Sequence, residues 1–209
     1  MNRVITIGRQ FGSGGHEVGS RLAKKLGIPF YDRELLKITA ENSRFAESYL
    51  KKMDEQKPHF LSLGSTASLS TINRFSMLLP NDEVFIEVGK VISQLAQQGP
   101  CVIVGRCADY VLKDMDTVNI FISADLEDRI QRKLVLEEHA GITKPEMKKI
   151  ILETDKNRAK FSEYYTHEEW GNAQKYDLCI NTSRVGINGA VDLIAAYLEM
   201  TNKPGILPD

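Results

Sequence analysis

The sequence predicts an α/β fold in which a mainly parallel β-sheet is covered by helices on both faces. Two observations predict it. Short apolar runs typical of buried strands alternate along the chain with longer segments whose apolar residues recur at helical spacing. The first such run passes through a glycine-rich turn into a helix, as in a parallel strand-helix unit. In such sheets the ligand crevice lies at the carboxyl ends of the strands.

The predicted elements follow one another in a regular order. Strands are expected at residues 4–7, 28–31, 101–104, 118–122 and 176–180. Helices are expected at 16–26, after a cap at Asp32, at 44–57, at 81–98, after Asp125, at 144–160 and at 187–198. Residues 58–80 are rich in serine and threonine. That composition suits a mobile cover over a substrate and a disordered surface loop equally well.

The composition favours one globular domain and excludes several kinds of partner. The chain has 209 residues, 42% of them hydrophobic, which is enough for one core. Its 27 basic and 28 acidic residues leave a formal charge of −1, so we expect no general attraction to nucleic acid or to a membrane. The odd number of cysteines, without metal-binding spacing, favours a reducing cytosol. The N-terminus lacks a signal-peptide pattern, and we expect a cytoplasmic protein with small-molecule partners.

The glycine-rich turn after the first strand is the first candidate site. Glycines at 12, 14 and 15 allow backbone N–H groups to turn inward, and the helix that follows adds a partial positive charge. These features favour a polyphosphate-binding role for the segment over that of a plain tight turn. A phosphate-binding loop usually places Lys and Ser or Thr after its last glycine, but here Gly15 and His16 occupy those two positions.

A second candidate is Gly105-Arg106, which follows the apolar strand at 101–104. Arg106 is expected to enter the crevice at the carboxyl end of that strand, where a guanidinium can hold a phosphate with two hydrogen bonds. The alternative is a surface arginine after a strand. A glycine beside it favours close approach of a ligand.

Two charged pairs form the third candidate. Asp155 and Arg158 are three residues apart on the long predicted helix, and Arg129 and Arg132 have the same spacing on the helix before it, so each pair shares one helical face. A solvated charged face explains such spacing as well as a site does. Aromatic residues near the end of the long helix, among them Phe161 and Trp170, are interpreted as packing rather than as a platform for a base.

Taken together, these motifs resemble the cytidylate kinase-like proteins, relatives of the nucleoside monophosphate kinases. The resemblance extends from Val4 to about Leu198. It is carried by the glycine loop, Tyr31-Asp32, Gly105-Arg106, Asp155-x-x-Arg158 and the run Tyr176-Asp177-Leu178-x-Ile180-Asn181-Thr182-Ser183.

The resemblance implies a P-loop kinase fold, a three-layer sandwich with a five-stranded parallel sheet. It implies one domain over 1–209, with a substrate-binding insert at about 42–80 and a mobile lid at about 129–170. Such enzymes transfer the γ-phosphoryl group of ATP, with Mg²⁺, to CMP or dCMP. The resemblance also assigns roles to residues. The donor phosphates would be held by Gly12, Ser13, Gly14, Gly15, His16 and Glu17, the acceptor by Asp32, Arg106, Asp109, Arg129 and Arg132, and the lid would supply Arg158 and Asp155.

The chain departs from the family pattern at two places. Gly15 stands in the position of the loop lysine, and Cys107 stands where an acid usually follows Gly-Arg, so that Asp109 is the candidate substitute. We hypothesise that Arg9, together with Arg158, supplies the missing positive charge. Two other functions stay open on the sequence: a nucleotide-binding regulatory protein with little or no kinase activity, and a kinase for another small acceptor. The Mg²⁺ ligands and the oligomeric state are not predicted.

Overall fold

The computed structural model of the protein describes residues 3–32, 82–136 and 139–201. The predicted helices at 44–57 and after Asp32, and the insert at 42–80, lie outside these ranges. Within the described residues no helix combines the length and apolar character that a membrane span requires.

The sheet has five strands that are all parallel, in the order β2-β3-β1-β4-β5. The strands are β1 (Val4–Arg9), β2 (Phe30–Tyr31), β3 (Val102–Val104), β4 (Thr117–Ser123) and β5 (Leu178–Asn181). In the central strand, Ile5 lies opposite Val102 of β3 and Val118 of β4. The predicted α/β fold with a five-stranded parallel sheet is confirmed.

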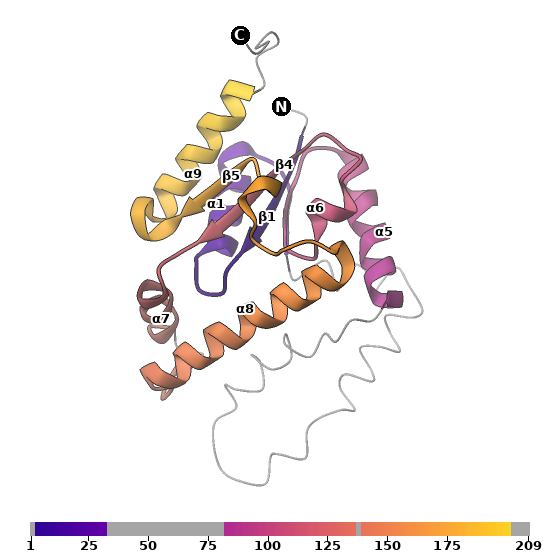
Figure 1. Ribbon diagram of the computed structural model, residues 1–209. Coiled ribbons are helices and arrows are strands. Elements are labelled where there is room, and N and C mark those ends of the chain that lie inside the picture. Colours follow the sequence, from indigo (N-terminus) through magenta and orange to yellow (C-terminus); the bar gives the residue numbers. More distant parts are fainter. Residues whose placement is uncertain (1–2, 33–81, 137–138, 202–209) are drawn as a thin grey trace.

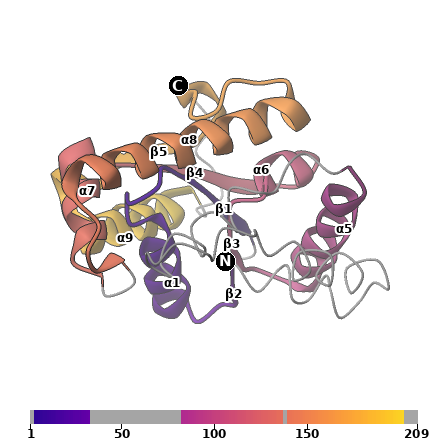
Figure 2. The same cartoon turned by 90° about the horizontal axis from the view of Figure 1, so that it is seen from below.

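Helices cover both faces of this sheet (Figures 1 and 2). They are α1 (Gly15–Leu26), α5 (Asp82–Gln98), α6 (Ala108–Val111), α7 (Leu126–Leu134), α8 (Lys144–Thr166) and α9 (Thr182–Thr201), with a short 3-10 helix, η3, at Ala173–Lys175. Helices α1 and α9 pack on one face, and α5 and α6 pack on the other. Helix α8 crosses the carboxyl end of β1, so it lies over the crevice in which ligands of such sheets bind.

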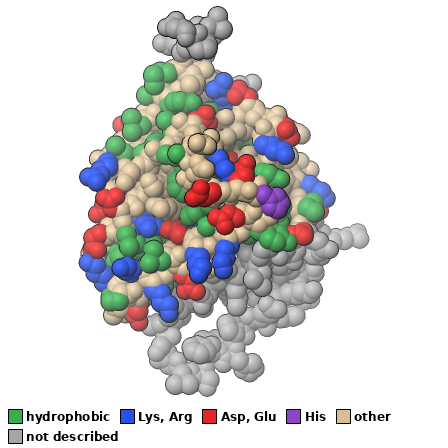
Figure 3. All heavy atoms as spheres, in the orientation of Figure 1, with side chains coloured by type: hydrophobic (Ala, Val, Ile, Leu, Met, Phe, Trp, Pro, Cys, Tyr) green, Lys and Arg blue, Asp and Glu red, His purple; other side chains and the backbone are tan. Residues whose placement is uncertain are grey.

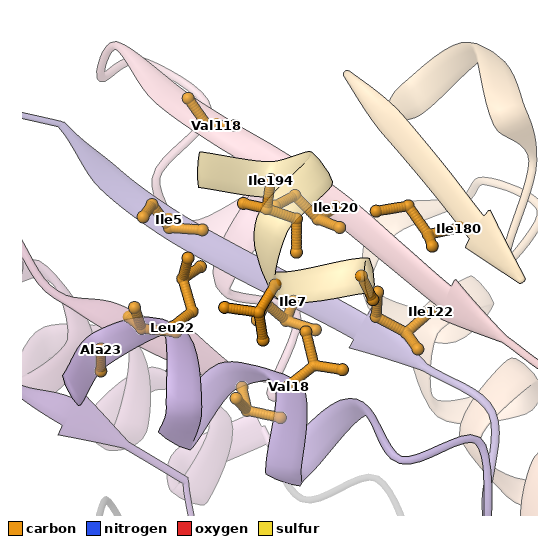
Figure 4. Packing of buried hydrophobic residues seen from close by; sticks show 14 of the residues in the cluster. Ile5, Ile7, Val18, Leu22, Ala23, Val118, Ile120, Ile122, Ile180 and Ile194 are labelled. Carbon is orange, nitrogen blue, oxygen red and sulfur yellow. The ribbon is translucent and has the colours of Figure 1, made fainter. Parts of the chain in front are cut away.

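The side chains of β1 alternate between the two cores, because successive residues of a strand point to opposite faces. Ile5 and Ile7 pack against Val18 and Leu22 of α1 and against Ile194 of α9 (Figure 4). The side chains of β1 that point the other way meet α5 and the cleft described below. Both faces of the strand are thus buried, which explains why residues 4–7 are apolar except for Thr6, whose hydroxyl donates to Oδ1 of Asn119 (2.6 Å).

Several elements differ in extent from the expectation; β2 and β5, for example, begin two residues later than expected, at Phe30 and Leu178. Helix α8 continues to Thr166 instead of ending near 160, and α9 begins at Thr182 instead of 187, with a break at Gly186 (φ 70°). The early turns of α9 carry few apolar residues, so hydrophobic spacing marked only its later part. Strand β1 continues through Arg9 because that residue still pairs with Ile122 of β4.

Helix α1 approaches the sheet most closely at Gly19. A methyl group there would lie 2.9 Å from Cε2 of Phe30 and 3.0 Å from Cγ2 of Val104. In contrast, a methyl group at Gly89 of α5 would lie 3.7 Å from Val111, an ordinary contact.

We therefore expect opposite effects from two Gly→Ala substitutions. Gly19→Ala overpacks the layer between α1 and the sheet and lowers the free energy of unfolding by about 1–2 kcal/mol. Gly89→Ala removes backbone freedom from the unfolded chain at no steric cost and raises it by about 0.5–1 kcal/mol. Urea unfolding of both variants measures the difference; equal effects would contradict the packing described here.

Candidate active site

The glycine loop connects β1 to α1 and adopts a conformation that needs glycine. Gly12 and Gly14 have φ angles of 79° and 84°, in the left-handed region. A Cβ at Gly14 would overlap Cδ1 of Ile187, so a side chain there would force Ile187 to move. The loop delivers the chain to the first turn of α1, whose leading N–H groups have no partner inside the helix. Such a turn binds anions.

The loop is fixed to the strands and helices beside it by hydrogen bonds. The N–H of Gln10 donates to the carbonyl of Ile122 (3.0 Å), and its side-chain oxygen accepts from the N–H of Ala124 (3.2 Å). Ser13 is buried and donates its hydroxyl to the carbonyl of Gln10 (2.8 Å), while its own carbonyl accepts from Thr182 (2.7 Å). The N–H of Ser13 also donates to the carbonyl of Gln10 (3.3 Å), so both the hydroxyl and the backbone of Ser13 hold the loop together.

Phe11 attaches the loop to α7 and α8. Its N–H donates to Oδ1 of Asp155 (2.7 Å), and its carbonyl accepts from Nη1 of Arg129 (3.4 Å). Arg129 and Asp155 also pair with each other, and both side chains are largely buried. The ring of Phe11 lies under two cations, Lys133 Nζ at 4.6 Å and the guanidinium carbon of Arg158 at 5.5 Å. The loop therefore depends on α7 and α8 for its position.

Arg132 belongs to the same group, since its Nη1 donates to the carbonyl of Gly12 (2.5 Å). The family resemblance associates Arg129 and Arg132 with the acceptor, whereas the structure places both against the glycine loop and away from Arg106. The two arginines that the resemblance assigns to the acceptor thus lie against the glycine loop.

Asp32 follows β2 and lies between two residues of the first strand-loop-helix unit. Its Oδ1 is 3.3 Å from Nη2 of Arg9, and its Oδ2 is 2.6 Å from Nδ1 of His16. Burial raises the pKa of Asp32, but the hydrogen bond from His16 and the charges of Arg9 and Arg106 outweigh it, so the net pKa is below the usual value. Asp32 is therefore an ionised carboxylate at neutral pH. It joins His16, which occupies the usual Ser or Thr position of the loop, to the end of β2.

Arg158 is held over the end of β1, where its Nη1 donates to the carbonyl of Arg9 (2.9 Å). Burial and the charge of Arg9 lower the pKa of Arg158 to about 9, and Asp155 opposes them. The guanidinium is still charged at neutral pH. Among the described residues its buried Nε has no hydrogen-bond partner, so it retains donor capacity for a ligand.

A cleft opens between the ends of β1 and β3 and the second half of α8. It encloses about 100 Å³, which accommodates part of a ligand rather than the whole of one. Its lining comprises Thr6, Ile7, Gly8, Arg9, Gly105, Arg106, Cys107, Ala108, Asp109, Thr154, Asn157, Arg158, Phe161, Ser162, Trp170 and Tyr176. Arg9, Arg106 and Arg158, on three different elements, thus meet in one place.

The turn after β3 holds three consecutive residues in the left-handed region: Gly105, Arg106 and Cys107, with φ angles of 74°, 62° and 52°. This conformation is strained for the two non-glycine residues, and such strain is common at functional sites. Burial raises the pKa of the Cys107 thiol to about 12, so the thiol is protonated and unreactive. Burial also raises the pKa of Asp109, which lines the cleft beyond Arg106.

Comparison with known proteins assigns the chain to a family. The sequence pattern of the cytidylate kinase-like family matches residues 4–184. The chain belongs to the cytidylate kinase-like family. Two curated relatives agree. The cytidylate kinase of Ignicoccus hospitalis is 23% identical over 196 residues, which cover 93% of this chain and 98% of the relative. That of Staphylothermus marinus is 24% identical over 162 residues, which cover 77% and 89%.

Solved structures show which fold this cytidylate kinase-like protein has. An uncharacterised protein from Eubacterium ventriosum matches with a TM-score of 0.70 and 26% identity, over 94% of this chain and 98% of that one. Shikimate kinase from Bacteroides thetaiotaomicron (TM-score 0.52, 15% identity, 95% and 99% covered) and a gluconokinase from Sinorhizobium meliloti (0.51, 14%, 96% and 98%) share the fold. Family and fold together make the protein a phosphotransferase with a P-loop kinase fold.

Sequence reasoning missed several residues of this kinase-like site. Phe11 carried no charge and no turn signal, although an aromatic residue inside a glycine loop is a signal in hindsight. Ser162 of α8 has no distinguishing sequence pattern, and Asn157 stands out only as part of the run Asp155-Lys156-Asn157-Arg158. Phe161 and Trp170 pack as expected, Phe161 on Tyr165 and Trp170 on Phe121, and both also line the cleft.

Figure 3 shows the face of the molecule that carries α8. Acidic and basic side chains are interspersed over it and form no patch of a single sign. The positive charge of the site is local, as the near-neutral composition requires.

We expect Asp155→Asn to destabilise the protein strongly. The variant leaves the buried guanidinium of Arg129 without its counter-charge, and breaking one partner of a buried pair costs about 3–5 kcal/mol of unfolding free energy. Glu127→Gln, which breaks the solvent-exposed pair with Lys144, is the matched control and should leave the urea midpoint almost unchanged. Similar midpoints for the two variants would show that the Asp155 pair does not hold the loop.

Proposed function

We propose that this protein transfers the γ-phosphoryl group of ATP, with Mg²⁺, to a nucleoside monophosphate, and that the acceptor is CMP or dCMP. The observation that carries the proposal is the meeting of Arg9, Arg106 and Arg158 beside a phosphate-binding turn. These guanidinium groups repel one another, and Arg9 and Arg106 both lower the pKa of Arg158. An anionic ligand would relieve that repulsion.

The donor side is formed by the glycine loop. Its N–H groups and the first turn of α1 would hold the β- and γ-phosphates of ATP. Arg129 and Arg132 fix the loop by donating to the carbonyls of Phe11 and Gly12. Phosphoryl transfer needs alignment and charge neutralisation more than covalent chemistry from the protein. A loop fixed by buried hydrogen bonds supplies the alignment without reorganisation during the reaction.

The acceptor side is formed by the cleft. Arg106 and Arg158 would hold the acceptor phosphate, which places its attacking oxygen between the cleft and the glycine loop. Arg158 is joined through Asp155 and Phe11 to the donor loop, because Asp155 and Arg158 lie one turn apart on α8. One helix would thus set the distance between donor and acceptor. The proposed lid at about 129–170 would contain α8, whose position over the end of β1 would exclude water from the phosphates.

Mg²⁺ would be bound mainly by the phosphates of the substrates. Among the described residues no group of three or more His, Cys, Asp or Glu side chains forms a ready-made metal site. That pattern suits Mg²⁺, which is commonly held by one or two carboxylates together with substrate phosphates and water. Both carboxylate oxygens of Asp32 already pair with Arg9 and His16, so phosphate and water oxygens would be the main ligands of the ion, which would neutralise charge on the phosphates.

Asp109 is the residue that would recognise a cytosine base. A carboxyl oxygen accepts a hydrogen bond from the exocyclic amine of cytosine, whereas uracil presents a carbonyl oxygen at that position. Asp109 lies in the cleft with Phe161 and Trp170, and the small volume there suits one ring. Asp109 would then do what the acid after Gly-Arg does in the family pattern, from two positions further along the chain.

The experiment that tests the proposal supplies ATP and Mg²⁺ with CMP, dCMP, UMP, AMP or GMP and follows ADP together with the diphosphate product. We expect ADP and CDP or dCDP to form in equal amounts. Nucleotide binding without acceptor-dependent ADP would contradict a kinase and support a regulatory protein. ADP formed only with a non-nucleotide acceptor would support the third function.

We expect Asp109→Asn to reduce the preference for CMP over UMP. The amide of asparagine donates as well as accepts, so it no longer rejects the uracil carbonyl. The ratio of the two kcat/KM values should fall about tenfold, within the range of a single base contact. Asp114→Asn, at an exposed position just after α6, is the control and should leave the ratio unchanged. An unchanged ratio in Asp109→Asn would place base recognition elsewhere.

A further inference from the structure

We infer that Arg9 takes the place of the phosphate-loop lysine as a catalytic residue, and that an arginine at 9 excludes any side chain at 15. The inference rests on the proposed function, because it assigns Arg9 to the phosphoryl group in transfer. The cation of the loop has thus moved from position 15, where the usual lysine is replaced by glycine, to position 9, where an arginine stands.

Gly15 leaves no room for a side chain beside Arg9. A Cβ at this position would lie 2.5 Å from Cβ and 2.9 Å from Cγ of Arg9, closer than real Cβ atoms approach their neighbours. The Cβ of Arg9 cannot move aside, because Arg9 is still paired with Ile122 in the sheet and its carbonyl accepts from Arg158. While Arg9 is present, position 15 must therefore be glycine.

The other end of the Arg9 side chain rests on a second glycine. A Cβ at Gly105 would overlap Nη1 of Arg9 and lie 2.8 Å from its Cζ. Gly15 opens α1 and Gly105 follows β3, so two bare backbone positions from different elements form a slot for this one side chain. We call it the Arg9 slot.

The Arg9 slot places the guanidinium where phosphate chemistry would need a cation. The side chain is 13% exposed, lines the cleft, and lies 3.3 Å from Asp32, which also binds His16. It runs from the donor loop, where its Cβ touches Gly15, to the acceptor cleft, where its guanidinium meets Arg106 and Arg158. A planar guanidinium in that position can donate two parallel hydrogen bonds to a phosphoryl group, which an ammonium cannot.

Four proteins test the exchange: the natural chain, Arg9→Gly, Gly15→Lys, and the double variant Arg9→Gly/Gly15→Lys. We expect Arg9→Gly to lower kcat about 100-fold, the usual effect of removing one donor that stabilises the transition state. Gly15→Lys, although it restores the familiar lysine, should lower both the melting temperature and kcat, because its Cβ displaces Arg9. The double variant should melt higher than Gly15→Lys and turn over at least tenfold faster than Arg9→Gly.

Two results would overturn the inference. One is a Gly15→Lys variant that melts and turns over like the natural chain, because the two side chains would then coexist. The other is a double variant no faster than Arg9→Gly, because lysine and arginine would then not be interchangeable. Gly15→Ala, made with Arg9 and with Arg9→Gly, measures the steric part by melting temperature alone. It should destabilise only when Arg9 is present, and an equal effect in both backgrounds would also overturn the inference.

The melting measurements separate this inference from the proposed function. If the natural chain forms no product with any acceptor, the proposed function fails, while the coupling between positions 9 and 15 is still measured by stability. If the natural chain is active and no coupling is found, the proposed function stands and only the role of Arg9 fails.

Discussion

The site depends on one buried carboxylate. Asp155 accepts the N–H of Phe11 and pairs with Arg129, so it binds the glycine loop to α7 and α8 at once. A glycine loop has little preference of its own for a single conformation, because glycine gives up more freedom on folding than other residues. The position of the loop must therefore be imposed from outside. Asp155 imposes it from the same helix face that carries Arg158 toward the cleft.

This arrangement explains how positive charge can be concentrated in a nearly neutral protein. Arg129 is neutralised by Asp155, and Asp32 neutralises part of the charge of Arg9. Arg106 is presented by three successive left-handed residues, a strained turn that persists because the sheet and α6 fix both of its ends. Arg9, Arg106 and Arg158 line the cleft together, where a phosphate would stabilise them. Local geometry thus concentrates positive charge at the site, whereas proteins that bind polyanions more broadly have a basic composition overall.

Within the described residues, the sequence was sufficient for the alternation of strands with the longer helices, because burial on both faces makes most residues of a parallel strand apolar. It also identified Gly105-Arg106, since the carboxyl end of a parallel strand is where ligands bind. It could not separate Asp155 and Arg158 from a solvated helix face, because helical spacing alone does not say what a face meets. The anchoring of Phe11 to Asp155 and the contacts of Arg129 and Arg132 with the glycine loop join residues more than a hundred positions apart in the chain. No local pattern encodes such contacts.

The central claim is that one site holds a donor phosphate on the glycine loop and an acceptor phosphate on Arg106 and Arg158, with Arg9 between them. A crystal structure of the protein with ADP, Mg²⁺ and CMP tests this most directly. The account predicts the β-phosphate of ADP on the backbone of residues 12–17, the phosphate of CMP on Arg106 and Arg158, and the guanidinium of Arg9 still in its slot, facing the gap between the two nucleotides. A nucleotide bound away from the loop, or an Arg9 side chain turned out of the slot toward solvent, would contradict it.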